Sequence, residues 1–470
     1  VRLVVQGQHM SKEKGDFVNA FSPVPHASGV RTIMSIATEQ DWDAVACDLT
    51  QGFIQADLPK GEKTIYISPP PGVEEDPDVV YEVRRPLYGM PHSGRCLHVT
   101  WSNWLKEQGF YKVGYEGAMF AKDDGEDKIL LSTHVDDSFI TGSSTEKLKL
   151  FVDAINERFD ATFEWNPSEY IGMEWERDRA NRTSKLHQAA FSEKMLKAYG
   201  AWQHPKPPLT PMRPDTRLSS EDQPEVADPK LHRRYRAIVG AIGWLNSGTR
   251  PDLSYCYAEL SKFAARPGRV HMDAAEYCLA YISGTYEKGI VYRAGKSGEG
   301  NTLSGWVDAD FAADLDTRRS HTGYLLMLNG GPVSWKSTKQ KSVSLSTAES
   351  EWYAASEAGK EIIYLRRILD DFGFEQKGPT TLYEDSRAVI CMAENPVNRK
   401  SSRHIDTRRH FIGELVAAGT VKLADCRTDE MVADALTKSL PYPSFKKHRA
   451  TMMGEEVKQS KVYQIVMQVG

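Results

Sequence analysis

The chain has 470 residues, 40% of them hydrophobic and 26% charged, with a formal net charge of −5 at pH 7. This length exceeds one ordinary hydrophobic core, so the composition predicts a soluble globular protein of about two to four domains. No apolar run is long enough to span a membrane, which excludes the helical membrane proteins. The six cysteines are scattered without CxxC pairs, which argues against a zinc site or a disulfide framework and favours a reducing compartment.

The two ends of the chain carry different signals. Residues 1–7 are typical of a strand entered midway, without an initiator Met or a signal-peptide pattern, so we expect a fragment or a processed product. Basic residues are dense around 399–410 and 446–449. Such runs are either solvated faces or patches that contact phosphates, for which local charge matters more than net charge.

Short apolar runs alternate with helical spacings in the first part of the chain. Strands are predicted over 44–49, 64–67 and 80–83, and a buried hairpin over 129–140. Helices are predicted over 30–40, 96–108 and 145–159. This order is an α+β pattern.

A proline-rich break over 205–214 and a polar stretch over 219–228 predict a linker or loop. Three helices are expected to follow, over 235–245, 253–264 and 271–283. A new domain is predicted to begin near 296, with strands over 303–308, 323–328 and 333–336, a long helix over 346–372, a strand over 381–383, a helix over 406–418, a strand over 421–424 and a helix over 431–438. Antiparallel strands followed by alternating helices and strands indicate an α/β unit with a mixed sheet.

A first group of acids consists of Asp48, at the end of a predicted strand, and the adjacent Asp136 and Asp137 in the predicted hairpin. An isolated Asp-Asp pair is most often a solvated turn. If the strands are neighbours, the carboxylates converge at one end of the sheet. Such a cluster suits Mg²⁺, which prefers oxygen ligands, and a pair of these ions can assist phosphoryl transfer.

A second group consists of Asp308, Glu351, Asp385 and Asp434, which come from a strand, a helix, a strand and a helix. These four acids also suggest a site for two metal ions. Asp434 has a simpler explanation as well, since an acid is favoured near the start of a helix by the helix dipole.

The motifs of this chain follow one another in the order of a known family. They are Arg2-Leu-Val with Gly7, Phe21-Ser-Pro-Val24, Asp48 with Phe53, Leu87-Tyr-Gly89 with Arg95, His134-Val-Asp-Asp137, Tyr235-Arg-Ala-Ile-Val-Gly240, Gly248-Thr-Arg-Pro-Asp252, Asp308-Ala-Asp310, Ser334-Trp-Lys-Ser337, Ser346-Thr-Ala-Glu-Ser-Glu351, Arg403-His-Ile-Asp406 with His410-Phe-Ile412, and Ala433-Asp-Ala-Leu-Thr-Lys438. In this order they resemble the reverse transcriptase and ribonuclease H region of copia-type LTR retrotransposon polyproteins.

The resemblance implies an α+β right-hand polymerase with fingers, palm and thumb, followed by an α/β ribonuclease H-like domain with a mixed five-stranded sheet. The expected domains are N-terminally truncated fingers and palm over 1–200, a thumb or connection over 201–295, ribonuclease H over 296–445 and a C-terminal tail over 446–470. The implied activities are RNA-directed DNA synthesis and cleavage of the RNA strand of RNA–DNA hybrids.

The resemblance also implies roles for individual residues. Asp48 and Asp136 would be the principal metal ligands of the polymerase, with Asp137 in support, and Asp308, Glu351, Asp385 and Asp434 would serve the nuclease. Glu349 competes with Glu351, which is preferred because Glu351-Trp-Tyr-Ala-Ala355 resembles the Glu-Leu-x-Ala pattern of related nucleases. The implied substrate-binding residues are Phe53, Arg2, Tyr88, Gly89, Arg95 and His410.

Two of these residues have alternative explanations. Phe53 falls where an aromatic side chain excludes the ribose 2′-hydroxyl and so selects deoxynucleotides, but plain core packing would also explain it. His410 would lie near the scissile phosphate or have a structural role.

The resemblance further implies Mg²⁺ as cofactor, two ions per active site, with Mn²⁺ as a substitute. The implied partners are an RNA template, a DNA primer, RNA–DNA hybrid and dNTPs, with no membrane. A homodimer, or association with other polyprotein products such as integrase, fits the same family and its DNA integration pathway. The implied location is the cytoplasm, in virus-like particles, or the nucleus.

Several positions depart from the family pattern: His134 replaces Tyr, residues 90–94 replace Leu-Lys-Gln-Ala-Pro, Leu97 replaces an aromatic residue and residues 50–52 replace Lys-Thr-Ala. The intact acids favour an active enzyme. The departures favour a decayed or repurposed element that binds nucleic acid. A third hypothesis is ribonuclease H activity without synthesis.

Overall fold

The computed structural model describes residues 3–455 except 60–62, 71, 74–75, 77, 215, 296–299 and 395–402, and for 403–406 it describes only the backbone. The chain forms two compact units: Val1–Ile33 with Trp42–Ile171, and Met34–Asp41 with Gly172–Gly470. Helix α1 (Ala27–Glu39) crosses this division, so its last residues belong to the second unit. The finer boundaries predicted at 200, 295 and 445 stay predictions.

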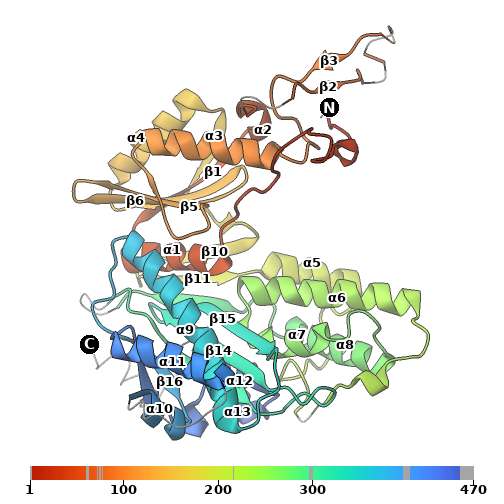
Figure 1. Ribbon diagram of the computed structural model, residues 1–470, viewed down its shortest axis with the longest axis vertical. Helices are drawn as coiled ribbons and strands as arrows, with labels where there is room; N and C mark the ends of the chain where they lie inside the picture. Colours follow the sequence, from red (N-terminus) through yellow and green to blue (C-terminus); the bar gives the residue numbers. More distant parts are fainter. Residues whose placement is uncertain are drawn as a thin grey trace. The chain divides into compact units, whose positions relative to one another are not determined.

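The first unit is built on an antiparallel sheet of six strands with the order β4-β5-β6-β7-β1-β8 (Figure 1). Its strands are β1 (Asp43–Leu49), β4 (Tyr111–Lys112), β5 (Met119–Asp124), β6 (Asp127–His134), β7 (Asp137–Gly142) and β8 (Ala161–Trp165). The other elements after α1 are α2 (Gly52–Gln55), β2 (Tyr66–Ile67), β3 (Tyr81–Glu82), α3 (Ser93–Glu107), α4 (Thr145–Arg158) and β9 (Glu169–Tyr170). Strands β2 and β3 pair with each other.

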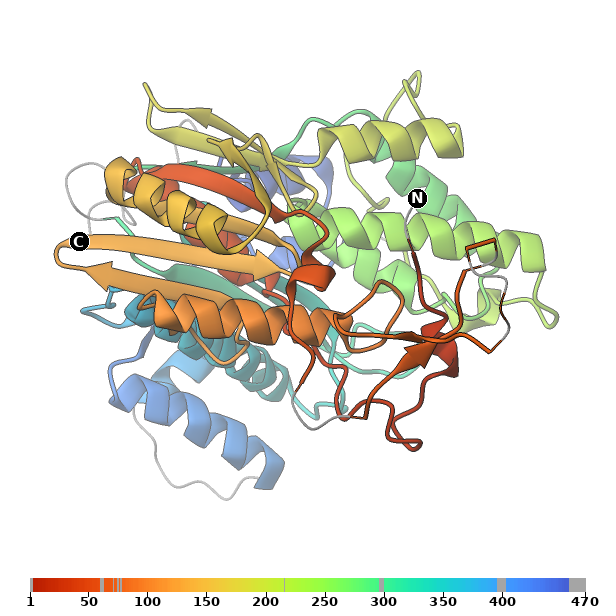
Figure 2. The same cartoon turned by 90° about the horizontal axis from the view of Figure 1, so that it is seen from above.

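Helices α3 and α4 supply the core that supports this sheet, and Figure 2 shows them in orange and yellow against its strands. In α4 the apolar residues Leu148, Phe151, Val152 and Ile155 recur at helical spacing and are buried. Ser144 caps α4 by accepting a hydrogen bond from the Lys147 N–H. Burying each large apolar side chain stabilises the fold by about 1.5–3 kcal/mol, so this packing fixes the strands that carry Asp48 and Asp137.

The second unit contains a mixed five-stranded sheet with the order β15-β14-β13-β16-β17. Strands β15, β14 and β13 are antiparallel, whereas β13, β16 and β17 are parallel. Its strands are β13 (Ser304–Asp310), β14 (His321–Leu328), β15 (Gly331–Lys339), β16 (Thr380–Glu384) and β17 (Val421–Asp425). This topology confirms the predicted ribonuclease H-like fold class. Beside it, β12 (Gly289–Arg293), β11 (Thr183–His187) and β10 (Met173–Asp178) pair in that order.

The helices of the second unit after α1 are α5 (Ala189–Tyr199), α6 (Pro229–Gly248), α7 (Ser254–Ser261), α8 (Arg269–Ser283), α9 (Thr347–Asp371), α10 (Arg387–Glu394), α11 (Arg403–Ala417), α12 (Asp434–Thr437) and α13 (Tyr442–Met452). The predicted helices over 145–159, 271–283 and 346–372 agree with α4, α8 and α9 within about two residues. Over 253–264 the helix is shorter than predicted, because a 3-10 turn occupies Pro251–Leu253 and α7 ends at Ser261. Among the described helices, none is both long and apolar enough to cross a bilayer.

Strand β14 is buried along its whole length because helices cover both of its faces. Leu325 and Met327 both lie on one face, in a core shared with α6, α7, α8 and α12. Thr322, on the other face, accepts a hydrogen bond from Gln340, which also bonds to the Ser350 carbonyl of α9. The connection helices and the mixed sheet therefore share one hydrophobic core.

A buried ion pair joins the connection to the C-terminal helix. Arg250 and Asp252 are each 1% exposed, and the Arg250 Nε and Nη2 groups donate to the two Asp252 oxygens at 2.8 Å. Tyr281 donates a further hydrogen bond to Asp252 at 2.7 Å, and Arg449 of α13 donates to the Tyr281 hydroxyl at 3.1 Å. Burial raises the pKa of Asp252 by itself, but Arg250 outweighs this effect and the pKa is lowered.

We predict that Arg250→Met or Asp252→Asn destabilises the protein by about 3–5 kcal/mol, because each leaves an uncompensated buried group. Thermal or denaturant unfolding of the purified variants measures this change. Arg269→Met is the matched control: its ion pair with Asp273 is exposed and should contribute at most about 1 kcal/mol. Equal small losses for all three variants would contradict the role of the buried pair.

Candidate functional site

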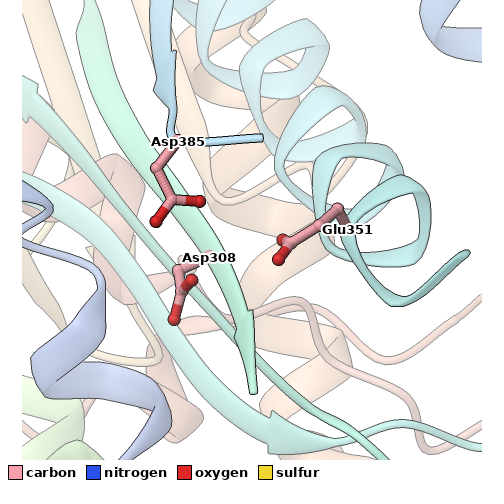
Figure 3. Close-up of side chains that lie close together, drawn as sticks. All are labelled: Asp308, Glu351 and Asp385. Carbon is pink, nitrogen blue, oxygen red and sulfur yellow. The ribbon is translucent and has the colours of Figure 1, made fainter. Parts of the chain in front are cut away.

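A group of carboxylates gathers where β13 and β16 separate. The two parallel strands pair from Ser304 with Thr381 to Trp306 with Tyr383. Asp308 and Asp385 each lie two residues beyond the last pair, so both come to the carboxyl ends of neighbouring strands. Asp308, Glu351 and Asp385 have oxygens that all lie within 4.8 Å of one another, and Figure 3 shows the three side chains close together.

Glu351 comes from the first turns of α9, whose start is held by two hydrogen bonds. The Ser346 hydroxyl accepts a hydrogen bond from the Glu349 N–H at 3.2 Å, and the Glu349 carboxylate accepts one from the Leu345 N–H at 2.7 Å. Glu349 is thus used as a cap. Glu351, two residues later, is 4% exposed and faces Asp308 and Asp385.

Burial and mutual repulsion raise the pKa values of this group. Burial is the largest cause for Asp308, followed by the charge of Asp434, and the pKa of Asp308 rises to about 6. Burial followed by the charge of Glu384 raises the pKa of Glu351 far above its usual range. The pKa values of Glu384 and Asp385 are also raised, first by burial. Without a compensating cation, these acids resist ionising together.

Helix α12 brings Asp434 and Thr437 to the same place. The Thr437 hydroxyl donates a hydrogen bond to Asp308, and Asp434 is close enough to raise the Asp308 pKa. Gly323, which pairs with Asp308 across the sheet, makes this approach possible. A Cβ atom at Gly323 would lie 2.8 Å from side-chain atoms of Leu436 and Thr437. Lys438 follows the helix and forms an ion pair with Asp434 at 2.7 Å.

The carboxylate group fits a divalent cation such as Mg²⁺. The Glu351 Oε2 atom is buried and has no hydrogen-bond partner within the described part of the chain. A buried acceptor left in this way is costly unless a donor or cation is present. Three carboxylate oxygens at this spacing are the hard ligands that Mg²⁺ prefers.

The acids of the first unit are neighbours, but they are less closely grouped and more exposed than those of the second unit. Asp48, at the end of β1, pairs with Asp137 of β7, and the Leu49 N–H donates to the Asp136 carbonyl at 3.1 Å. Burial and then Asp136 raise the pKa of Asp48, and burial, Asp136 and Asp48 raise that of Asp137. Asp48 and Asp137 are exposed. In the described residues, these acids do not form a group as close as that of Asp308, Glu351 and Asp385.

The hairpin that carries Asp136 contains a strained residue. His134 pairs with Asp137, which leaves Val135 and Asp136 as a two-residue turn, and Val135 has φ of 62°. A β-branched residue rarely adopts this conformation, which costs about 1–2 kcal/mol. A Cβ atom at Gly52 would lie 3.3 Å from the Asp136 Cβ, so α2 packs directly against the turn. The predicted tight turn at Asp136 is therefore present.

The predicted substrate contacts occupy several places. Phe53 is half-buried on α2, with its ring centroid 4.8 Å from that of Tyr88. Gly89 has φ of +91°, and a Cβ atom there would lie 2.0 Å from the Val5 carbonyl oxygen. Arg95 donates to the Phe21 carbonyl at 3.4 Å. His410 is exposed on α11 and is not part of the carboxylate group, and Arg2 lies outside the described residues.

Sequence reasoning missed three neighbours of the carboxylates: Glu384, Thr437 and Lys438. Glu384 is fully buried, and its charge is the leading electrostatic influence on Glu351. Thr437 and Lys438 belong to the motif Ala433-Asp-Ala-Leu-Thr-Lys438. The resemblance of this motif to the family implied a role for Asp434 alone. The helical spacing of Lys438 from Asp434 could have indicated the ion pair.

We predict that Asp308→Asn stabilises the metal-free protein at pH 7. An acid whose pKa is raised on folding favours the folded state at low pH, and that stability is lost as the pH rises from the unfolded value toward about 6. Thermal unfolding in EDTA at pH 5 and pH 7 tests this: the gain should be larger at pH 7. Asp153→Asn, at an exposed position on α4, should change neither midpoint. A loss of stability in Asp308→Asn at pH 7 would contradict the repulsion.

Comparisons with known proteins agree with this geometry. Residues 1–214 match the family described as reverse transcriptase (RNA-dependent DNA polymerase). The chain is 32% identical to the retrovirus-related Pol polyprotein from transposon TNT 1-94 of Nicotiana tabacum, over 94% of this chain and 33% of that protein. It is 31% identical to the Pol polyprotein from transposon RE2 of Arabidopsis thaliana, over 94% of this chain and 30% of that protein. The chain thus spans about a third of these relatives.

Among solved structures, the foamy viral protease-reverse transcriptase in complex with RNA/DNA hybrid is 13% identical, with a TM-score of 0.47, over 87% of this chain and 46% of that one. A likeness at this score is too weak to establish the fold, which rests on the strand order of the mixed sheet. The sequence matches to these two relatives cover 94% of the chain. Residues 1–214 thus match the reverse transcriptase family, and the chain is similar to retrotransposon Pol polyproteins over 94% of its length.

Proposed function

We propose that this chain copies an RNA template into DNA from a DNA primer and degrades the RNA strand of the resulting hybrid. Both reactions are phosphoryl transfers, in which positioning and charge neutralisation supply most of the catalysis. The observation that carries the proposal is the buried group of Asp308, Glu351 and Asp385, with its unpartnered Glu351 oxygen. The match of residues 1–214 to the reverse transcriptase family supports the synthetic activity.

Asp308, Glu351 and Asp385, with Asp434 beside them, would hold divalent cations in the nuclease, and Asp48, Asp136 and Asp137 would hold them in the polymerase. Mg²⁺, two ions per site, is the proposed cofactor, and Mn²⁺ is a substitute. When bound, such ions neutralise charge on the transferring phosphoryl group and activate an attacking oxygen.

The chain's own residues prepare the nuclease site. The Thr437 hydroxyl donates to Asp308, which orients this carboxylate before substrate arrives. Helix α9 and the mixed sheet are rigid supports, so the carboxylates need little rearrangement.

A second candidate function is hybrid cleavage without DNA synthesis. It is favoured by the contrast between the two acid groups, because Asp48 and Asp137 are exposed and do not converge as the nuclease acids do. Under this candidate the first unit would bind nucleic acid but incorporate nucleotides weakly or not at all.

The proposed partners follow from the proposed reactions: RNA template, DNA primer, RNA–DNA hybrid and dNTPs. The relatives are polyproteins, so a homodimer or association with other polyprotein products, such as integrase, is part of the proposal. So is a location in cytoplasmic virus-like particles or in the nucleus.

We predict that Asp136→Asn abolishes only synthesis and Glu351→Gln only cleavage, each by at least about a hundredfold, the loss seen when one preorganised electrostatic group is removed. The assays are dNTP incorporation on a primed RNA template and cleavage of a labelled RNA–DNA hybrid, in Mg²⁺ and in Mn²⁺. Glu349→Gln is the matched control for Glu351→Gln, since this cap residue should affect stability far more than cleavage.

The outcomes separate the two candidate functions. Cleavage without synthesis by the unmodified chain would select the second candidate. If the unmodified chain cleaves no hybrid in either metal, or if Glu351→Gln cleaves at the unmodified rate, the proposal for the nuclease fails.

Phe53→Ala tests whether this half-buried ring selects the sugar. If Phe53 excludes the ribose 2′-hydroxyl, the variant should incorporate rNTPs at least about tenfold better relative to dNTPs, since removing a steric exclusion relaxes discrimination by about 1–3 kcal/mol. Single-nucleotide incorporation with each triphosphate measures this ratio. An unchanged ratio together with a lowered unfolding temperature would show that Phe53 serves packing alone.

A further inference from the structure

Lys438 introduces a positive charge into the carboxylate group of the second unit. Its Nζ lies 2.7 Å from the Asp434 Oδ1. The backbone N–H of Lys438 also donates to the Asp434 carbonyl at 3.1 Å. This hydrogen bond closes the turn after α12 and places the Lys438 side chain near Asp434. The ion pair is therefore built into the local backbone.

The charge of Lys438 reaches beyond Asp434. It lowers the pKa values of Asp308, Asp310 and Asp385, in opposition to the burial that raises them. Burial alone would lower the pKa of Lys438, but Asp308 and Asp434 outweigh it, so the side chain stays an ammonium. The ammonium thus supplies part of the compensation that these acids require in the absence of divalent ions.

Asp434 lies beside Asp308 but is not one of the three converging acids. Asp308, Glu351 and Asp385 converge within 4.8 Å. An ammonium and a divalent ion cannot both occupy the same face of one carboxylate, because the cations repel each other. The Lys438 side chain is 39% exposed and the Asp434 side chain 8%, so the lysine can swing into solvent while the acid stays in place.

We propose that the Lys438 ammonium is an internal cation of the nuclease centre, which occupies Asp434 while the centre holds one divalent ion and must leave before a second ion binds there. The inference rests on the proposed nuclease function and makes Lys438 a positioning residue for its metal content. Affinity for the second ion is reduced by the cost of breaking the ion pair, so the second ion binds mainly when the phosphates of a hybrid add negative charge.

Mn²⁺ binding to the full chain without nucleic acid tests this inference, with free Mn²⁺ counted by its electron paramagnetic resonance signal. Each protein is also measured with the Glu351→Gln substitution added. The ions that this substitution removes are assigned to the nuclease centre. The unmodified chain should hold one such ion at concentrations where Lys438→Met holds two, with the second ion bound at least tenfold more tightly in the variant. Lys438→Arg should behave like the unmodified chain.

Two further variants keep the test decisive. Lys339→Met removes another partly buried lysine, whose Nζ lies 3.3 Å from an oxygen of Asp314. Asp314 is not part of the carboxylate group, so this variant should leave Mn²⁺ binding unchanged. Lys438→Gln removes the charge but keeps a hydrogen-bond donor, and it replaces Lys438→Met if that variant does not fold. Unchanged or weaker Mn²⁺ binding in the charge-removed variant would overturn the inference, because a lysine that merely orients Asp434 as a ligand gives that result.

Hybrid cleavage by the unmodified chain separates this inference from the proposed function. If the chain cleaves hybrid but loss of the Lys438 charge leaves Mn²⁺ binding unchanged, only the internal-cation inference fails. If the unmodified chain cleaves no hybrid, the proposed function fails. When both hold, Lys438→Met should reach half-maximal cleavage at a several-fold lower Mg²⁺ concentration than the unmodified chain.

Discussion

Repulsion among the buried carboxylates where β13 and β16 separate is the constraint on which the second unit depends. Desolvation makes each charge costly, and each neighbouring charge adds to the cost. The fold offsets part of it with the Thr437 hydroxyl on Asp308 and the Lys438 ammonium on Asp434. A divalent cation bound among these acids would offset the remaining cost.

The surrounding structure is arranged so that this group can form. Gly323 lets α12 approach the sheet beside Asp308, and the hydrogen bonds of Ser346 and Glu349 at the start of α9 fix the turn that presents Glu351. The core shared by the connection helices and the mixed sheet holds these elements in place. The acids of the first unit have another setting: a hairpin turn with strained Val135, backed by Gly52 of α2. One centre is buried and crowded, whereas the other is exposed and open to solvent.

Much of this could be predicted from the sequence, for physical reasons that differ between elements. Helices α4 and α9 are predicted by the spacing of their apolar residues and by their Ser caps, which are local signals. The carboxylates could be proposed from strand ends, but their convergence depends on β13 and β16 being parallel neighbours, which no local pattern encodes. The ordered motifs supplied that information by resemblance.

The remainder depends on three-dimensional neighbours. Glu384 looked like the end of a strand, yet it is fully buried beside Glu351. The choice between Glu349 and Glu351 required the cap geometry, since both acids lie near the start of the same helix. Gly52 stands where the family pattern has Ala, and a side chain at this position would press on the turn that carries Asp136. This contact is not encoded in the local sequence.

We propose that the three converging acids form a cation-binding centre. The most direct measurement is anomalous diffraction from crystals of the full chain grown with Mn²⁺. We expect an anomalous peak within coordination distance, about 2.0–2.4 Å, of oxygens of Asp308, Glu351 and Asp385, and no such peak in crystals of Glu351→Gln. Mn²⁺ bound elsewhere on the chain, with no peak among these three acids, would contradict it.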